Sequence, residues 1–396
     1  MTGVAALTQE ILPSIVALRH ELHAHPELGY EERETADRLL RRLETVRGLQ
    51  IRTGVARTGV VATLNAHMAG PCVALRADMD ALPSQEETAL PYSSEVAGRM
   101  HACGHDGHMS CLVGAALVLA RMADELPGKV KFIFQPAEEG GGGAPAMCNE
   151  GVLDDPRVDA IFALHGWPGV DLGSVELSAG PTMASSDRWT MTIDGTGTHA
   201  AFPHQGVDPI VVAAQVVTAL QTIASRTIDP LEPVVVTVGQ FHAGTASNII
   251  PDQAVLEGTM RTLSGGVREQ VKARIEQIAR QTAEAYGARA EVSFHNRYPV
   301  TMNDAAGVQM VAEVARSIVG TEHVSVEARP SMGSEDFSFF AEKVPAVYWR
   351  LGVRRPGEAR SPALHQPTYE FPDAALPIGI RMHCGIVRAF LRSGLR

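Results

Sequence analysis

The densest group of residues able to do chemistry lies in the segment MHACGHDGH, residues 100–108. Three histidines, one thiol and one carboxylate fall within nine positions, which packing alone does not explain. Cys103 and His105 lie two residues apart, so in extended or loop backbone both side chains can face one metal ion. The alternative interpretation is a histidine-rich surface loop, which this segment alone leaves open.

Two adjacent carboxylates form a second group. Glu138 and Glu139, in QPAEEG, follow a predicted buried strand and precede glycines. Neighbouring side chains diverge, so one can ligate a metal while the other faces a metal-bound water. A divalent ion lowers the pKa of bound water toward about 7, which leaves a carboxylate base a modest proton transfer. The alternative is a solvated glutamate pair in a turn.

Two single histidines complete a possible donor set. His165 lies in LHGWP and His365 in ALHQP, and each alone is more often a structural histidine than a ligand. With Cys103, His105 and Glu139 they make five N, S and O donors. Five donors suffice for two divalent ions if one donor bridges. Imidazole and thiolate favour zinc, while the carboxylate leaves manganese, cobalt or nickel open.

Asp78 lies at the end of another predicted strand, in RADMD, residues 76–80. At that place it can orient a ligand histidine through a hydrogen bond. The alternative is an aspartate that caps a turn or helix.

The elements that position these residues alternate between strand and helix. Short apolar runs bounded by turn residues predict buried strands, and residues 110–124 predict a buried helix. This alternation indicates an α/β fold with a mostly parallel sheet. Ligands of such sheets bind beyond the carboxyl ends of the strands, where the polar groups at 78–80, 135–140 and 165 fall. The predicted strands are residues 60–64, 72–76, 130–134 and 160–164.

From residue 186 the pattern changes to that of a smaller inserted α+β domain. Alternating or β-branched runs predict strands at 189–193, 234–238 and 254–263, and helical patterns cover 209–227 and 267–286. The α/β pattern resumes with a helix at 305–319 and a strand at 346–351. Residues 15–47 predict two helices, with a break at 25–29. We therefore expect a catalytic domain built from 1–185 and 299–396, interrupted by a domain at 186–298.

Composition limits the classes of partner. The chain has 396 residues, more than a single core usually supports, and 45% of them are hydrophobic and 20% charged. A net charge of -11 argues against nucleic acid, and no apolar run exceeds residues 111–120, which argues against a membrane span. The N-terminus lacks a signal-peptide pattern, and five cysteines without a C-x-x-C pair favour a reducing compartment. We expect a cytoplasmic protein.

Taken together, these motifs resemble the M20 metallopeptidase family, subfamily D. That group contains hippurate hydrolases, aminoacylases and auxin-conjugate amidohydrolases. The resemblance extends over nearly the whole chain, in the family's order. It is carried by residues 74–83, 100–108, 134–140, 195–204, 247–251, 331–337 and His365.

The resemblance implies two divalent ions per subunit, with Glu138 as general base and Asp78 behind a metal ligand. Many M20 enzymes have histidine at the position of Arg76 and aspartate at that of Cys103, and the change is typical of the D branch. In the implied ligand set, Cys103 bridges both ions, His105 and Glu139 complete one site, and His165 and His365 complete the other.

The resemblance also implies that residues 186–298 form a lid and dimerisation domain. His199 would donate to the developing oxyanion in the partner subunit's site, in a homodimer or a tetramer. Without the resemblance, His199 would be a surface histidine and Arg261 a solvated strand residue. The residues implied to hold the substrate's carboxylate or carbonyl are Asn248, Arg261, Gly333 and Ser334.

The expected function is therefore hydrolysis of the amide bond of N-acyl amino acids, of N-acetyl or N-benzoyl type. Glu138 would deprotonate a metal-bridging water and pass the proton to the leaving amine. A dipeptidase or carboxypeptidase with the same site is the first alternative. A non-catalytic protein that binds acyl amino acids is an alternative of another class. A lone nucleophilic thiol at Cys103 is a third, although no cysteine-protease motif surrounds it.

Overall fold

The structure is a computed structural model that describes residues 2–358 and 360–395, and it divides into two compact units. Unit 1 comprises the chain up to Gly180, Met302–Arg329 and the chain from Asp336 onward. Unit 2 comprises Pro181–Thr301 and Pro330–Glu335. The expected insertion, 186–298, falls inside unit 2. A second segment of unit 2, residues 330–335, was not expected. It joins the unit through backbone hydrogen bonds from Ala184 N to the carbonyls of Ser331 and Gly333.

Unit 1 is built on one eight-stranded sheet in the order β1-β2-β4-β3-β5-β16-β6-β15. β4, β3, β5 and β16 are parallel neighbours at its centre, and β1 and β2 add antiparallel strands at one edge. β2 and β3 are buried along their whole length, as continuous apolar runs predict. The bounds are β1 Leu49–Val55, β2 Gly59–Leu64, β3 Cys72–Asp78, β4 Lys129–Gln135, β5 Ala160–Asp171, β6 Val175–Glu176, β15 Val324–Ser325 and β16 Ala346–Arg354.

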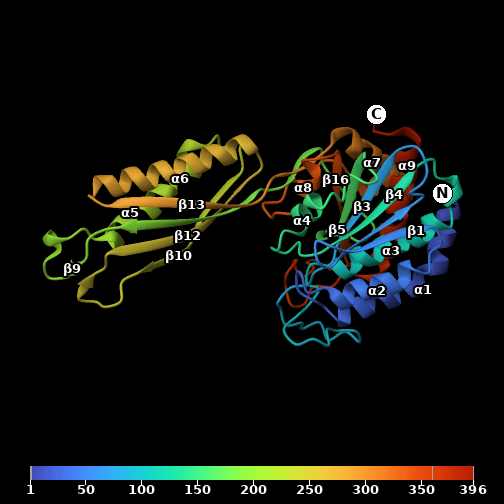
Figure 1. The fold of residues 1–396 in the computed structure, drawn as a ribbon, viewed down its shortest axis with the longest axis horizontal. Coiled ribbons are helices and arrows are strands. Elements are labelled where there is room, and N and C mark those ends of the chain that lie inside the picture. Colours follow the sequence, from blue (N-terminus) through green and yellow to red (C-terminus); the bar gives the residue numbers. More distant parts are fainter. Residues whose placement is uncertain (1, 359, 396) are drawn as a thin grey trace. The chain divides into compact units, whose positions relative to one another are not determined.

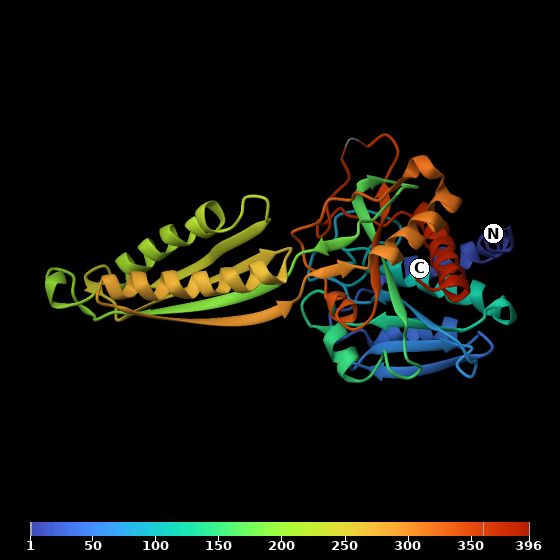
Figure 2. The same ribbon diagram turned by 90° about the horizontal axis from the view of Figure 1, so that it is seen from above.

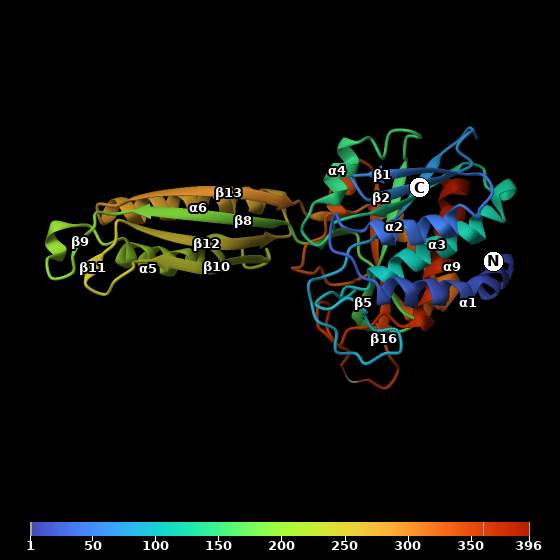
Figure 3. The ribbon, with the colours of Figure 1, turned by 60° about the horizontal axis from the view of Figure 1, so that its bottom comes forward.

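Helices α1, α2, α3 and α9 lie beside one another next to this sheet (Figure 3), whereas α4 and α8 contact each other instead. α1, α3 and α9 contact one another, and α3 and α9 contact β3. The predicted break at 25–29 separates α1 from α2, but α1 begins well before residue 15 and continues through Pro13. A buried stripe that includes Val4 and Ile11 holds this extra length against the core. The helices are α1 Thr2–Ala24, α2 Arg33–Leu43, α3 His105–Ala120, α4 Gly143–Asn149, α7 Ala305–Val319, α8 Ser338–Ala341 and α9 Leu376–Ser393.

Unit 2 contains a four-stranded antiparallel sheet in the order β10-β12-β8-β13, with α5 and α6 packed on one face (Figures 1 and 2). Alternate residues such as Trp189, Met191 and Leu256 are buried in its core. The bounds are β8 Ser186–Asp194, β9 Thr198–His199, α5 Pro209–Leu220, β10 Val234–Ala243, β11 Ile249–Ile250, β12 Gln253–Thr262, α6 Gly265–Ala285 and β13 Arg289–Tyr298, and the short strands β7 Gly180–Met183 and β14 Thr301–Asn303 flank the unit.

Two helical segments have the length and hydropathy of a membrane span, Pro209–Thr227 and Asp373–Ser393. The second contains α9, which lies mostly buried in the core of unit 1. The first contains α5, which packs Val212 and Val216 into the core of unit 2. Both segments thus serve as helices of folded units.

Candidate metal centre

The carboxyl ends of three adjacent parallel strands bring polar residues to one edge of the unit 1 sheet. β3 ends at Asp78, β4 ends at Gln135 just before the glutamate pair, and β5 carries His165. Parallel neighbours end at the same edge, so residues distant in sequence meet there. Helix α3 begins at the same edge with His105.

Cys103 lies where the chain turns into α3. Gly104 adopts the left-handed region with φ 88°, a conformation that glycine adopts without strain. The turn brings Cys103 Sγ to 3.4 Å from His165 Nε2. Cys103, Glu139 and His365 offer ligand atoms that all lie within 4.8 Å of one another.

Glu139 connects the remaining donors. Its Oε1 lies 3.2 Å from His365 Nε2 and 4.0 Å from His105 Nε2. Glu138, whose residue is 6% exposed, offers a ligand atom within 4.8 Å of those of His105 and Glu139. The structure therefore brings all five predicted ligands into one connected cluster in unit 1, with the predicted base beside them.

The cluster has the properties of a cation site. His105 Nε2 and Glu139 Oε1 are buried and have no hydrogen-bond partner among the described residues. His105 Nδ1 lies 2.7 Å from Asp80 O, an arrangement that leaves Nε2 facing the cluster. Burying polar atoms that make no hydrogen bond is unfavourable, and a divalent ion with N, O and S ligands would satisfy both.

Electrostatics at the cluster favour a positive charge. Burial lowers the pKa of His105, but Asp78, Asp80 and Glu139 outweigh it and raise that pKa to about 10. Burial, reinforced by Glu139 and Glu138, raises the pKa of the Cys103 thiol well above its usual value. A bound metal ion would supply the positive charge in place of these protons, so its binding would release protons.

Asp78 holds a histidine that the sequence prediction did not assign. Its carboxylate lies 2.7 Å from His108 Nδ1, while Gly166 N donates to His108 Nε2 at 2.8 Å. His108 therefore carries its hydrogen on Nδ1 and uses its other nitrogen as an acceptor. Asp78 also lies 3.5 Å from His105 Nε2. Burial raises the pKa of Asp78, but His105, Arg76 and His108 together lower it well below the usual value.

Arg76 is a further residue of the site that lay outside the prediction. Its guanidinium is buried and donates to Asp78 at 2.8 Å, to Gln135 Oε1 at 2.8 Å and to Asp336 at 3.2 Å. This chain thus carries, near the end of β3, a cation that neutralises two buried carboxylates, Asp78 and Asp336. A charged residue inside the apolar run 72–78 was the signal available in the sequence.

The candidate residues of unit 2 fall into two groups. Arg261 Nη1 donates to Ser334 Oγ at 2.7 Å, and the carbonyl of the neighbouring Gly333 accepts from Ala184 N at 2.8 Å. His199 is exposed and pairs with Ile249 between β9 and β11. The Asn248 carbonyl accepts from Ala200 N at 3.0 Å beside it.

These two groups lie at opposite ends of the unit 2 sheet. Asn248 precedes β12 at its Gln253 end, whereas Arg261 lies at the other end of the same strand. Eight residues of strand span about 26 Å. Within unit 2, the structure therefore places Arg261 with Ser334 and Gly333, and it does not bring His199 and Asn248 to them. Figure 1 shows β9, which contains His199, at one end of the unit 2 sheet.

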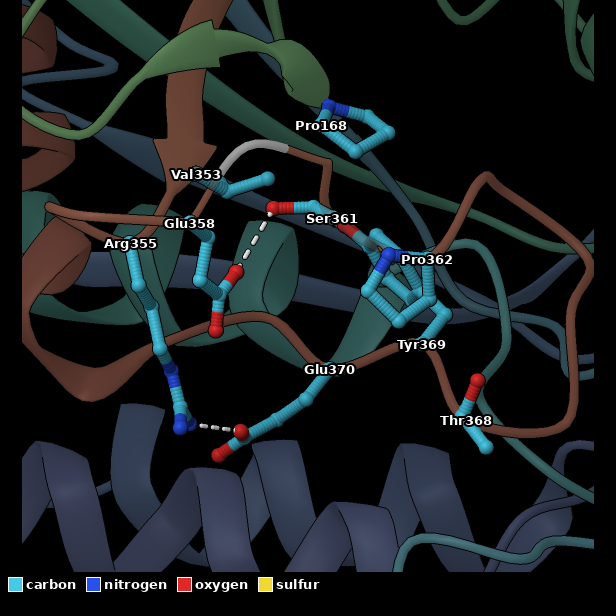
Figure 4. Close-up of a pocket in the computed structure, with 9 residues that line it drawn as sticks. All are labelled: Pro168, Val353, Arg355, Glu358, Ser361, Pro362, Thr368, Tyr369 and Glu370. Atoms are coloured by element: carbon cyan, nitrogen blue, oxygen red, sulfur yellow. Dashed lines mark hydrogen bonds and ion pairs between the residues drawn. The ribbon is translucent and has the colours of Figure 1, made fainter.

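A separate cavity of about 110 Å³ opens beside the segment that leads to His365 (Figure 4). Two residues of its lining, Arg355 and Glu370, form an ion pair, and Ser361 Oγ donates a hydrogen bond to Glu358 at 3.0 Å (Figure 4). Its described lining includes none of the five predicted ligands. The lining residues are Pro168, Val353, Arg355, Glu358, Ser361, Pro362, Thr368, Tyr369 and Glu370.

Comparisons with known proteins agree with this geometry. Residues 74–389 match Peptidase family M20/M25/M40. The chain is 42% identical to an N-acetyl-L-cysteine deacetylase of Bacillus subtilis (strain 168) over 339 residues, 86% of this chain and 80% of the relative. It is 42% identical to the IAA-amino acid hydrolase ILR1-like 4 of Arabidopsis thaliana over 383 residues, 95% of this chain and 86% of the relative.

A solved structure is also similar, that of a dinuclear metal-binding peptidase of the M20 family from Bacillus subtilis. The TM-score is 0.86 with 34% sequence identity, over 97% of this chain and 99% of that one. These comparisons confirm the predicted resemblance, the fold class and the class of enzyme, a metal-dependent amidohydrolase. The chain belongs to Peptidase family M20/M25/M40.

Proposed function

We propose that this protein hydrolyses the amide bond of N-acyl amino acids and releases a carboxylate and a free amino acid. The observation that carries the proposal is the convergence of five metal-type donors beside a buried glutamate, Glu138. The names of the relatives, a deacetylase of N-acetylcysteine and a hydrolase of IAA-amino acids, support an N-acyl amino acid as substrate.

Two divalent ions fit the donor set. We infer that Cys103 would be shared by the two ions, that His105 and Glu139 would complete one site, and that His165 and His365 would complete the other. Thiolate and imidazole favour zinc, and the carboxylate leaves manganese, cobalt or nickel open. When bound, such ions polarise the amide carbonyl and lower the pKa of water.

The protein's own residues move the proton and hold the substrate. Glu138 takes a proton from the attacking water and delivers it to the leaving amine. His199 and Asn248 donate hydrogen bonds to the carbonyl oxygen, on which negative charge develops during the reaction. Arg261, with Ser334 and the backbone of Gly333, binds the substrate's carboxylate, for which a guanidinium is well suited. Asp78 keeps the cluster oriented through its contacts with His105 and His108.

A homodimer is part of the proposal. One active site cannot take both His199 and Arg261 from the same unit 2, because β12 runs about 26 Å from Gln253, the end near which β9 and β11 lie, to Arg261. His199 of the partner subunit would have to complete the site. The edge strand β10 and helix α5 support association, because Phe241 is 41% exposed and Val211 48% exposed.

The test of the proposal is Glu138→Gln. The amide keeps the shape of the side chain but cannot accept the proton, so we expect turnover to fall about 10³-fold with metal content unchanged. Hydrolysis of N-acetyl and N-benzoyl amino acids and metal analysis of the same preparation measure both quantities. Turnover close to wild type in this variant would rule out Glu138 as the base.

A peptidase acting through the same site is the second candidate, and the similarity to the dinuclear metal-binding peptidase of Bacillus subtilis favours it. Parallel assays with N-acetyl amino acids, N-benzoyl amino acids and dipeptides separate the two. A binding protein without catalysis would show no turnover after loading with zinc, manganese, cobalt or nickel. A Cys103 nucleophile would keep its activity in the presence of a chelator.

We propose that the protein is located in the cytoplasm. All five cysteines are free thiols, and four of them are buried. A reducing compartment suits such a chain, since none of its thiols contributes a disulfide to stability.

A further inference from the structure

Two buried carboxylates from outside the donor set hold the turn that carries Glu138. Glu32 Oε1 accepts a hydrogen bond from Ala137 N at 2.8 Å. Asp80 accepts from the next two amides, Glu138 N at 3.0 Å and Glu139 N at 2.9 Å. Three successive peptide N–H groups are thus fixed by two side chains, which we call the carboxylate clamp.

The turn depends on such a clamp because its backbone is strained. Ala137 has φ 52°, in the left-handed region that residues with a Cβ rarely adopt. It is fully buried, and a Cβ added to Gly29 would lie 3.1 Å from both Ala137 Cα and Ala137 Cβ. The surroundings therefore impose the conformation, and Glu32 supplies the hydrogen bond at its centre.

Glu32 is itself rigidly placed. It is fully buried at the end of the segment 25–32 that joins α1 to α2. Its Oε2 accepts from Thr58 Oγ1 at 2.6 Å, so both carboxylate oxygens are engaged. Burial raises the pKa of Glu32 to about 6, which leaves the group mostly ionised at pH 8.

Asp80 links the clamp to the ligand cluster. Its side chain holds the amides of Glu138 and Glu139, while its main-chain oxygen lies 2.7 Å from His105 Nδ1. A displacement of the turn would therefore alter the spacing between the glutamate pair and His105. Positional errors of about 1 Å cost on the order of 10²-fold in rate.

We propose that Glu32 is a positioning residue for amide hydrolysis, which acts with Asp80 to hold Glu138 toward the substrate and Glu139 toward the other metal ligands. The inference rests on the proposed role of Glu138 as base. It assigns a task to the segment 25–32, which contributes none of the five donors.

The test compares three substitutions of Glu32 with one control in metal-loaded enzyme. Glu32→Ala removes the acceptor, and Glu32→Asp is one methylene shorter and cannot reach both Thr58 and Ala137. Glu32→Gln can accept from Ala137 and donate to Thr58, so it should restore the turn. Thr58→Val changes the same pocket but leaves the bond to Ala137 in place.

We expect kcat to fall at least about 10-fold in the alanine and aspartate variants, with KM and metal content close to wild type. Hydrogen exchange of the peptide spanning 137–139 should accelerate in the same variants, and the glutamine and Thr58→Val variants should resemble wild type in both. Glu32→Asp keeps the test decisive if the alanine variant does not fold. A wild-type kcat in Glu32→Asp, or unchanged exchange, overturns the proposal.

The two proposals fail in different ways. If the wild-type enzyme hydrolyses no N-acyl amino acid, the proposed function is wrong, and the exchange experiment still decides whether Glu32 holds the turn. If Glu138→Gln loses turnover while Glu32→Asp does not, the base is supported and the clamp is overturned.

Discussion

At the scale of single residues, the hydrogen bonds of each histidine decide what it can do. His105 directs Nδ1 to a backbone oxygen and keeps Nε2 for the cluster. His108 uses both nitrogens, one toward Asp78 and one toward Gly166 N. The two residues lie three positions apart in one motif. Residue type alone could not show that His105 is the candidate ligand and that His108 is a hydrogen-bonded neighbour.

His23 is a buried histidine outside the cluster whose charge should stabilise the fold. Its ring nitrogens lie 3.0 Å from Asp106 and 3.2 Å from Glu86. Burial lowers the pKa of His23, but the two carboxylates outweigh it and raise that pKa to about 9. A raised pKa means that this stabilisation is complete below the unfolded value near 6.5 and is lost as pH rises through about 9.

The prediction is that wild type loses more stability than His23→Gln between pH 6.5 and 9.5. The difference should be on the order of 3 kcal/mol, because the pKa of His23 is about 6.5 in the unfolded chain and about 9 in the folded protein. Denaturant unfolding of both proteins at the two pH values measures it. An equal pH dependence of the two proteins would contradict the assignment.

At the scale of elements, α3 depends on glycine for its close packing. A Cβ at Gly107 would lie 2.4 Å from Phe371 Cγ and Cδ1, so the ring or the helix would have to move. We expect Gly107→Ala to destabilise the protein by about 1–3 kcal/mol through overpacking. Gly3→Ala in α1 is the control, since its Cβ would meet nothing within 4 Å, and it should change stability by less than about 1 kcal/mol. Similar unfolding midpoints for the two variants would count against this packing argument.

Central strands were predictable from the sequence, and edge strands were not. β2 and β3 are buried throughout and appear in the sequence as continuous apolar runs. β1 lies at the sheet edge with mostly partly buried or exposed residues, so it lacks that signal and was not predicted. The turn after β4 was predicted to carry chemistry, but its conformation depends on Glu32, 105 residues earlier.

At the scale of the whole molecule, the proposed dimer makes a quantitative prediction. Glu138→Gln and His199→Ala should each be nearly inactive, the latter by about 10²–10³-fold. If His199 acts across the interface, about half of the dimers in an equal co-expression are mixed, and each has one intact site. The preparation should recover about a quarter of wild-type activity. Activity as low as that of either parent, or full activity in a monomer by sedimentation, would show that His199 does not act in trans.

The sequence by itself determined the kinds of donor, the central strands of the sheet and the family, because side-chain chemistry and hydrophobic periodicity are local properties. Only the tertiary structure decided which atoms meet. It gave His105 and His108 different hydrogen-bond partners, and it buried Arg76 between Asp78 and Asp336. It also brought Glu32 and Asp80 into hydrogen bonds with the same turn. These contacts join residues up to 260 positions apart. They depend on how close-packed elements fit together, for which no local pattern in the chain provides a signal.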